Sequence, residues 1–152
     1  MKDPLEYIND ALYFVVLPAR DGFVYCSGVN ISQFLPITRG RHKAMSNPAI
    51  RGLQIINLEI RTMALTEGAT PVSGAGQQCR GIAPTDDIWY TESLYIKDPP
   101  EGFAERVVVH AATSILGKIN KAIMLGADLP EGFLPPERLY SVIQGLCRQY
   151  GS

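Results

Sequence analysis

The clearest pattern of apolar and polar positions predicts a helix at residues 48–67 that is apolar on two sides. Asn47 is suited to cap the first turn, Pro48 suits the first helical position, and Gly68 provides a stop. One apolar stripe recurs along this segment at alternating spacings of four and three residues. Its members are Ala49, Leu53, Ile56, Ile60 and Met63.

A second apolar set in the same segment lies off that stripe and consists of Ile55, Leu58 and Leu65. A helix that is apolar on more than one side is either enclosed within its own fold or offers its second side to another subunit. Enclosure is the commoner arrangement. If the second alternative holds, Ile55, Leu58 and Leu65 are the interface residues, and the sequence leaves both alternatives open.

Three further helices are predicted. A short one begins at the N-terminus, where Asp3, Pro4 and Glu6 have the order of a capped first turn. A long one covers residues 103–125, which carry an apolar stripe at helical spacing, and a last one covers about 136–150.

Residues 12–17 and 23–26 are β-branched and aromatic and flank a turn, so they predict a hairpin. Continuation of the first helix to Leu17 is the alternative. Residues 27–47 carry glycines, prolines and a basic cluster with little periodicity, which is typical of a long loop.

The segment after the two-sided helix is rich in Gly, Pro, Ser, Thr and Gln, and we expect a flexible loop or arm at 69–83. Its glycines do not match a phosphate-binding loop. A dinucleotide-binding fingerprint would require glycine at the position of Cys79, and a P-loop would require Gly-Lys-Ser/Thr where Gly81-Ile82-Ala83 stands. Residues 88–96 contain Trp89, Tyr90, Thr91 and Tyr95, which are side chains of strand type, and predict a strand.

These elements predict a single α+β domain over residues 1–152, with three or four helices packed on a small, mostly antiparallel sheet. A chain of this length buries enough surface to fold without a metal or a disulfide.

Charge is balanced along the chain, with 14 basic and 15 acidic residues and a formal net charge of −1. This balance argues against a nucleic-acid partner and against an anionic membrane surface. The one basic concentration is Arg39, Arg41 and Lys43, followed by Arg51 and close to a helix start. Backbone N–H groups at a helix start favour anions, so these four residues are the candidate anion-binding site. A solvated basic loop is the competing interpretation.

Three widely spaced cysteines, Cys26, Cys79 and Cys147, argue against a secreted disulfide framework and against a paired-cysteine zinc site. The N-terminus lacks the order of a signal peptide, and the longest apolar run is too short to span a bilayer. We therefore expect a soluble protein of a reducing compartment, located in the cytoplasm or assembled into a particle made there.

Candidate chemistry is sparse. Cys79 is the best candidate nucleophile, but a thiolate needs a nearby base, and nothing in the sequence places His42 or His110 beside it. No spacing of His, Cys, Asp or Glu resembles a metal site. We expect no catalytic residue, no metal and no cofactor.

The resulting expectation is a non-enzymatic structural or assembly protein that forms a homo-oligomer or part of a larger macromolecular complex, of the kind found in virus particles. One alternative is a small enzyme or ligand-binding domain that holds an anionic ligand near residues 39–51. A nucleic-acid-associated factor is the other alternative.

Overall fold

The structure, a computed structural model, describes residues 5–8, 12–30, 48–74, 79, 81–83 and 88–124. This part of the chain forms five strands and two helices. In chain order they are β1 (Leu5–Ile8), β2 (Leu12–Ala19), β3 (Gly22–Asn30), α2 (Pro48–Thr66), β4 (Thr70–Ser73), β5 (Trp89–Lys97) and α3 (Phe103–Met124).

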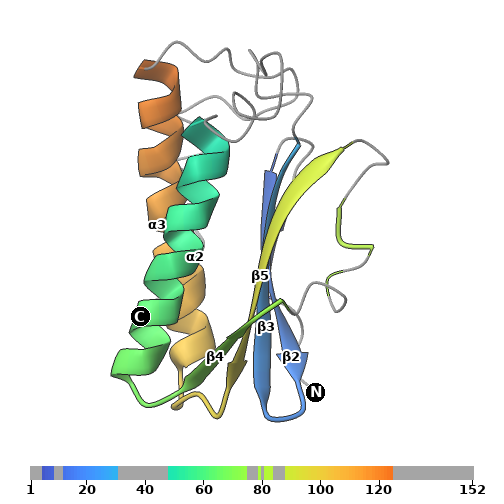
Figure 1. The fold of residues 1–152 in the computed structure, drawn as a ribbon, viewed down its shortest axis with the longest axis vertical. Coiled ribbons are helices and arrows are strands. Elements are labelled where there is room, and N and C mark those ends of the chain that lie inside the picture. Colours follow the sequence, from blue (N-terminus) through green and yellow to red (C-terminus); the bar gives the residue numbers. More distant parts are fainter. Residues whose placement is uncertain are drawn as a thin grey trace.

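The five strands form one sheet in the order β1-β2-β3-β5-β4, and all neighbours are antiparallel (Figure 1). β2 and β3 form the predicted hairpin, in which Ala19 faces Gly22 across a turn made by Arg20 and Asp21. Two-residue turns of this kind join antiparallel strands most tightly.

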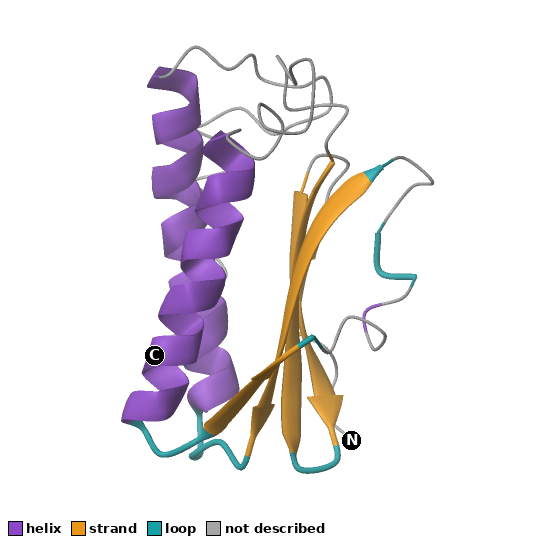
Figure 2. Ribbon diagram, in the orientation of Figure 1, coloured by secondary structure: helices purple, strands orange, loops and turns teal. Residues whose placement is uncertain are grey.

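Both helices lie on the same face of this sheet, which gives the molecule two layers (Figure 2). α2 packs against β3, β4 and β5, whereas α3 packs beside α2 and reaches β1 and β2. Successive strand residues alternate between the two faces. On β2, for example, Phe14 and Val16 enter the core beneath the helices, while Tyr13 and Val15 pack on the opposite face.

The α+β class is confirmed, and so are the two long helices, the hairpin and the strand near residues 88–96. The expectation of three or four helices is wrong for the described residues, which contain two. Leu5–Ile8 is a strand rather than a helix, because its backbone pairs with β2 from Leu5 opposite Val16 to Ile8 opposite Tyr13. The helix expected near residues 136–150 lies outside the described residues.

The segment expected to be a flexible loop or arm, residues 69–83, begins inside the fold. Ala69 is buried, and Thr70–Ser73 form the edge strand β4 against β5. Pro71 is accommodated there because an edge strand has one side without ladder hydrogen bonds. Flexibility of the rest of the segment stays a prediction.

Cys26 and Cys79 form a disulfide, with their Cα atoms 6.2 Å apart. The cysteine spacing argued against a secreted disulfide framework and did not predict this single pair. They are 53 positions apart, and the connection between β4 and β5 brings Cys79 back over the centre of β3. Spacing along the chain carries no signal for a pairing of this kind.

No helix in the described part of the chain is long and apolar enough to cross a membrane.

Candidate interface on helix α2

α2 begins at Pro48, as its sequence predicts, and ends at a Schellman motif. Gly68 adopts a positive φ of 84°, which glycine tolerates without strain. The Ala69 N–H then donates to the Ala64 carbonyl at 2.9 Å, and the Gly68 N–H donates to the Leu65 carbonyl at 3.3 Å. This cap fixes the last turn of α2 and with it the position of Leu65.

The inner side of α2 is the stripe recognised in the sequence. Leu53, Ile56 and Ile60 are buried in the core, and Met63 packs against that core while partly exposed. The side chain of Ala49 lies outside the described residues. The core therefore takes one side of the helix only.

The opposite side of α2 is exposed and apolar. The exposed fractions are 38 % for Ile55, 61 % for Leu58 and 62 % for Leu65. The described fold therefore does not enclose the second side of α2. Thr62 is also exposed and completes a run at spacings of three, four and three residues, so all four side chains share one helix face. We call Ile55, Leu58, Thr62 and Leu65 the outer stripe.

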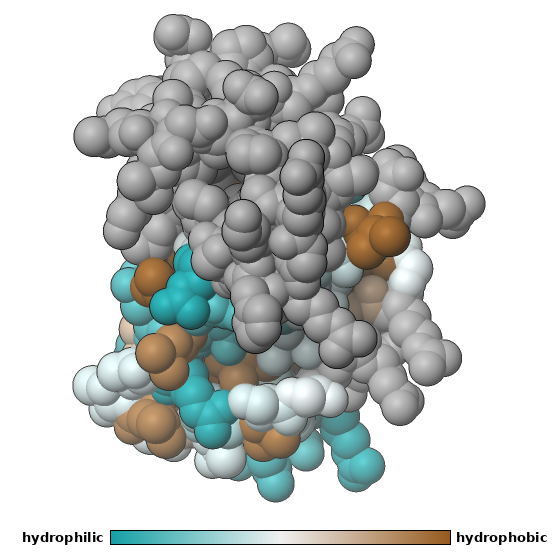
Figure 3. All heavy atoms as spheres, turned by 45° about the horizontal axis from the view of Figure 1, so that its top comes forward, coloured by the Kyte–Doolittle hydropathy of each residue, from teal (hydrophilic) through white to brown (hydrophobic). Residues whose placement is uncertain are grey.

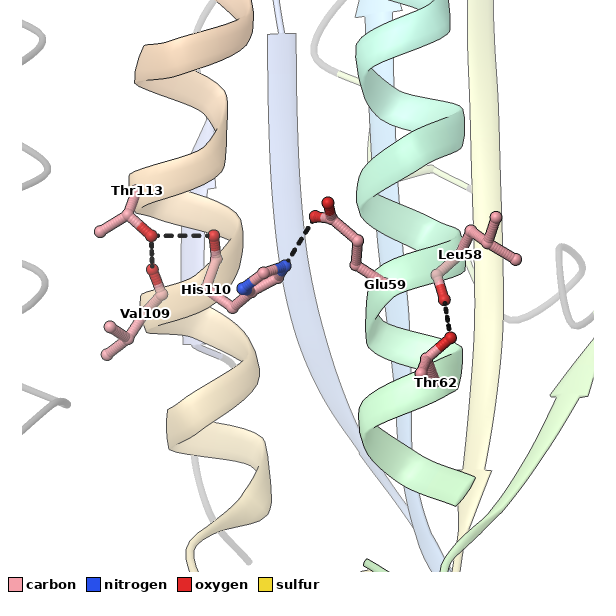
Figure 4. A network of polar contacts seen from close by, with 6 residues as sticks. All are labelled: Leu58, Glu59, Thr62, Val109, His110 and Thr113. Atoms are coloured by element: carbon pink, nitrogen blue, oxygen red, sulfur yellow. Dashed lines mark hydrogen bonds and ion pairs between the residues drawn. The ribbon is translucent and has the colours of Figure 1, made fainter. Parts of the chain in front are cut away.

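Thr62 does not interrupt the apolar character of the outer stripe. Its hydroxyl donates a hydrogen bond to the Leu58 carbonyl at 3.1 Å, as Figure 4 shows. The hydroxyl thereby makes its hydrogen bond inside the helix, as serine and threonine commonly do. The methyl group is the part of Thr62 that remains to contact a partner.

One flank of α2 is fixed to α3. Glu59 points toward α3, where its carboxylate lies 2.9 Å from His110 Nε2, whereas Leu58 points away from α3 (Figure 4). Eight residues further along, just past the end of α2, Glu67 pairs with Arg106 of α3. Arg106 also lies over the Phe103 ring, 5.5 Å from its centroid.

The other flank of α2 is fixed to the sheet. Gln54 donates to the Tyr90 hydroxyl of β5 at 3.0 Å, and Arg61 donates to the Ser73 hydroxyl of β4. Together with the buried inner side, these contacts hold α2 on three sides. The outer stripe therefore lies on a helix that is fixed in place, and less conformational entropy is lost when a partner binds to it.

Between α2 and the sheet, three polar side-chain atoms are buried without a hydrogen bond of normal geometry: Tyr25 Oη and Ser27 Oγ on β3, and Asn57 Nδ2 on α2. Burial raises the pKa of the Tyr25 phenol above its ordinary value, the nearby Ser27 hydroxyl offsets part of this rise, and the Glu92 carboxylate adds to it. Each buried polar group without a partner costs stability. Their contribution to stability can be tested by substitution at Tyr25.

The structure describes only some of the other residues that the sequence singled out. Arg39, Arg41 and Lys43 lie outside the described residues, and Arg51 is exposed near the start of α2, at one end of the outer stripe. Cys79 is oxidised, so it offers no thiolate in this structure. In the ranges that the structure describes, no group of three or more His, Cys, Asp or Glu residues is placed to hold a metal.

The sequence interpretation named the three large apolar members of the outer stripe but missed Thr62. The spacing of 55, 58, 62 and 65 was the signal that could have found it. Figure 3 shows apolar patches separated by polar side chains over the described part of one face of the molecule. Of the six large apolar side chains exposed in the described part, α2 supplies three.

No protein-family model, no curated protein and no solved structure matches this chain. Function is therefore inferred from the residues and geometry of the chain itself.

Proposed function

We propose that this domain is a structural assembly protein that self-associates, with two copies packing through their outer stripes. The observation that carries the proposal is the exposed apolar run of Ile55, Leu58 and Leu65 on the side of α2 opposite the core. Removing such a run from water is favourable in proportion to the apolar area buried. Several large apolar side chains exposed on one face of a fixed helix are typical of a protein-protein contact.

A second copy of the chain is the partner that suits this stripe. Its spacing of three and four residues is that of helices that pair side by side. Its four members carry no charge, so the same patch on another copy meets it without repulsion. Such a self-complementary patch is what a two-fold dimer requires.

An antiparallel arrangement of the two α2 helices pairs the apolar side chains of the two outer stripes and keeps like charges apart. With the two-fold axis between Leu58 and Thr62, Ile55 of one copy faces Leu65 of the other. The two Arg51 side chains then lie at opposite ends of the contact, whereas a parallel arrangement brings them together. Like charges opposite one another are destabilising.

The wider proposal is that this pair is a building unit of a larger macromolecular assembly in the cytoplasm, a virus particle being one such assembly. It is supported by the two-layer fold and by the lack of a catalytic motif in the sequence.

The test compares the native mass of the purified chain with that of two variants. Leu58→Lys places a charge at the centre of the outer stripe. Val72→Lys is the matched control, because Val72 is 45 % exposed and lies opposite Tyr95, which packs on the sheet face away from the helices. We expect an oligomer for the parent and for Val72→Lys, and a folded monomer for Leu58→Lys.

Two results would contradict the proposal. If Leu58→Lys unfolds the chain, Leu58 belongs to the core. If Leu58→Lys folds and remains as oligomeric as the parent, copies associate through another surface.

A further inference from the structure

The sheet face away from the helices is apolar at its centre. Tyr13, Val15, Val24 and Cys26 are all buried there, although no helix of the described chain lies on this face. Side chains from the sheet itself surround them, namely Leu17, Ala19, Trp89 and Tyr95. The cover over this centre comes from Cys79, Ile82 and Ala83, which pack against the same cluster.

Among the described residues, the cover contacts the sheet through the disulfide and a few side chains only. We call Cys79 and Gly81–Ala83 the covering segment. Ile82 and Ala83 are each only partly buried, and Gly81 is exposed and has no side chain. Fixing the backbone of a segment costs conformational entropy at every residue, which two partly buried side chains do not repay. Apart from the peptide chain that leads from β4 to β5, the bond from Cys79 to Cys26 is the covalent attachment of this segment to the sheet among the described residues.

We infer that the Cys26–Cys79 disulfide is a redox-sensitive latch: its reduction releases the covering segment and uncovers the apolar centre of the sheet. This device lies on the opposite face from α2 and is independent of the proposed self-association.

The reaction is a thiol-disulfide exchange with a small dithiol as reductant. Cys79 is partly exposed whereas Cys26 is fully buried, so the thiolate of the dithiol attacks the Cys79 sulfur. The Sγ–Sγ bond breaks, and the Cys26 sulfur leaves with the electron pair and takes a proton. The second thiol of the reductant then displaces Cys79, which also takes a proton. The protein ends as two thiols and the reductant as a cyclic disulfide, so two electrons and two protons are transferred.

The sheet does not depend on the latch for its strand pairing. Cys26 stands on β3, which is hydrogen-bonded along its length to β2 and to β5. A reduced Cys26 remains a small apolar side chain among Tyr13, Val15 and Val24, an environment that a free cysteine tolerates. Reduction should therefore release the cover locally and leave the strands paired.

Trp89 reports directly on this face. It is the one tryptophan of the chain, and its ring centroid lies 5.5 Å from that of Tyr13 on the sheet face away from the helices. A second probe is the Ile82 amide, which donates to the Cys79 carbonyl at 3.3 Å in the closed turn. Both probes are separate from the outer stripe of α2.

The experiment uses the full chain with and without dithiothreitol, together with Cys79→Ser, in which the latch cannot form. Cys147→Ser is the control, since it leaves Cys26 and Cys79 able to pair. In the reduced chain and in Cys79→Ser we expect hydrogen exchange at the Ile82 amide to be at least tenfold faster. We also expect acrylamide to quench Trp89 at least twofold more strongly, while the amides of α2 and β3 keep their protection.

Two results would overturn the inference. If neither the Ile82 amide nor Trp89 changes on reduction, apolar packing alone holds the covering segment. If protection is lost together in the covering segment, α2 and β3, the disulfide is a cross-link of the whole fold rather than a local latch. Should Cys79→Ser fail to fold, reduction of the parent chain decides between these results.

Discussion

Tyr13 on β2 lies directly opposite Gly28 on β3, and its ring occupies the space that a side chain at position 28 would need. A Cβ atom built at Gly28 lies 2.4 Å from Cε2 of Tyr13. The Tyr13 ring also contacts Trp89, with the two ring centroids 5.5 Å apart. Glycine on a sheet with an aromatic ring across it is a recognised way to fill the gap that glycine leaves.

Gly28→Ala should therefore lower the free energy of unfolding by about 1–3 kcal/mol, the usual cost of overpacking. Denaturant unfolding measures the change. The control is a double-mutant cycle with Tyr13→Ala, which removes the ring that the new methyl group meets. If the two losses simply add in the double variant, the ring is not the reason for glycine at position 28.

The two-sided character of α2 predicts opposite responses at adjacent positions. Ile56 is fully buried and Ile55 is 38 % exposed. Ile56→Ala should lower the free energy of unfolding by about 2–5 kcal/mol, because it leaves a cavity in the core. Ile55→Ala should lower the free energy of unfolding of the monomer by less than about 1 kcal/mol. The monomer is obtained by working at low protein concentration or by combining the substitution with Leu58→Lys. Equal losses at the two positions would show that both residues are core residues.

Tyr25 gives a pH-dependent prediction. Its pKa is raised by burial, so above about pH 10 the unfolded chain loses the phenol proton while the folded chain keeps it. The folded state then binds more protons than the unfolded state, and stability falls as pH rises past 10. Tyr25→Phe should reduce this fall; Tyr13 and Tyr90, whose pKa values are also raised by burial, contribute to the fall that remains.

At pH 7 the same Tyr25→Phe substitution should leave the free energy of unfolding unchanged or raise it by about 1 kcal/mol, because the buried hydroxyl makes no hydrogen bond of normal geometry. Denaturant unfolding at pH 7 and at several values above pH 9 provides both measurements. A clear loss of stability at pH 7 would mean that the hydroxyl is satisfied, by Ser27 or by an ordered water.

The sequence predicted the elements whose signals are local. Pro48 and Gly68 bound α2, and the β-branched and aromatic residues of 12–17 and 23–26 mark the hairpin. Leu5–Ile8 was misread because a helix-capping order can stand before a segment whose backbone finds a partner strand. Local propensity is overridden when tertiary pairing satisfies the backbone.

The features that the sequence did not predict depend on contacts between residues that are distant along the chain. β4 has only four residues and little apolar character, and it is a strand because Thr70 and Ser73 reach Lys97 and Leu94 of β5. The disulfide joins positions 53 residues apart, which no spacing rule selects. For the candidate interface, the sequence identified Ile55, Leu58 and Leu65, but only the fold shows which side of α2 the core takes.

Sedimentation equilibrium of the parent chain over a hundredfold range of concentration tests the proposed self-association most directly. One chain has a mass of 16.7 kDa. The proposal predicts that the apparent mass rises with concentration to at least twice this value, and that Leu58→Lys stays at the mass of one chain throughout. A parent chain that remains at 16.7 kDa across the whole range would contradict it.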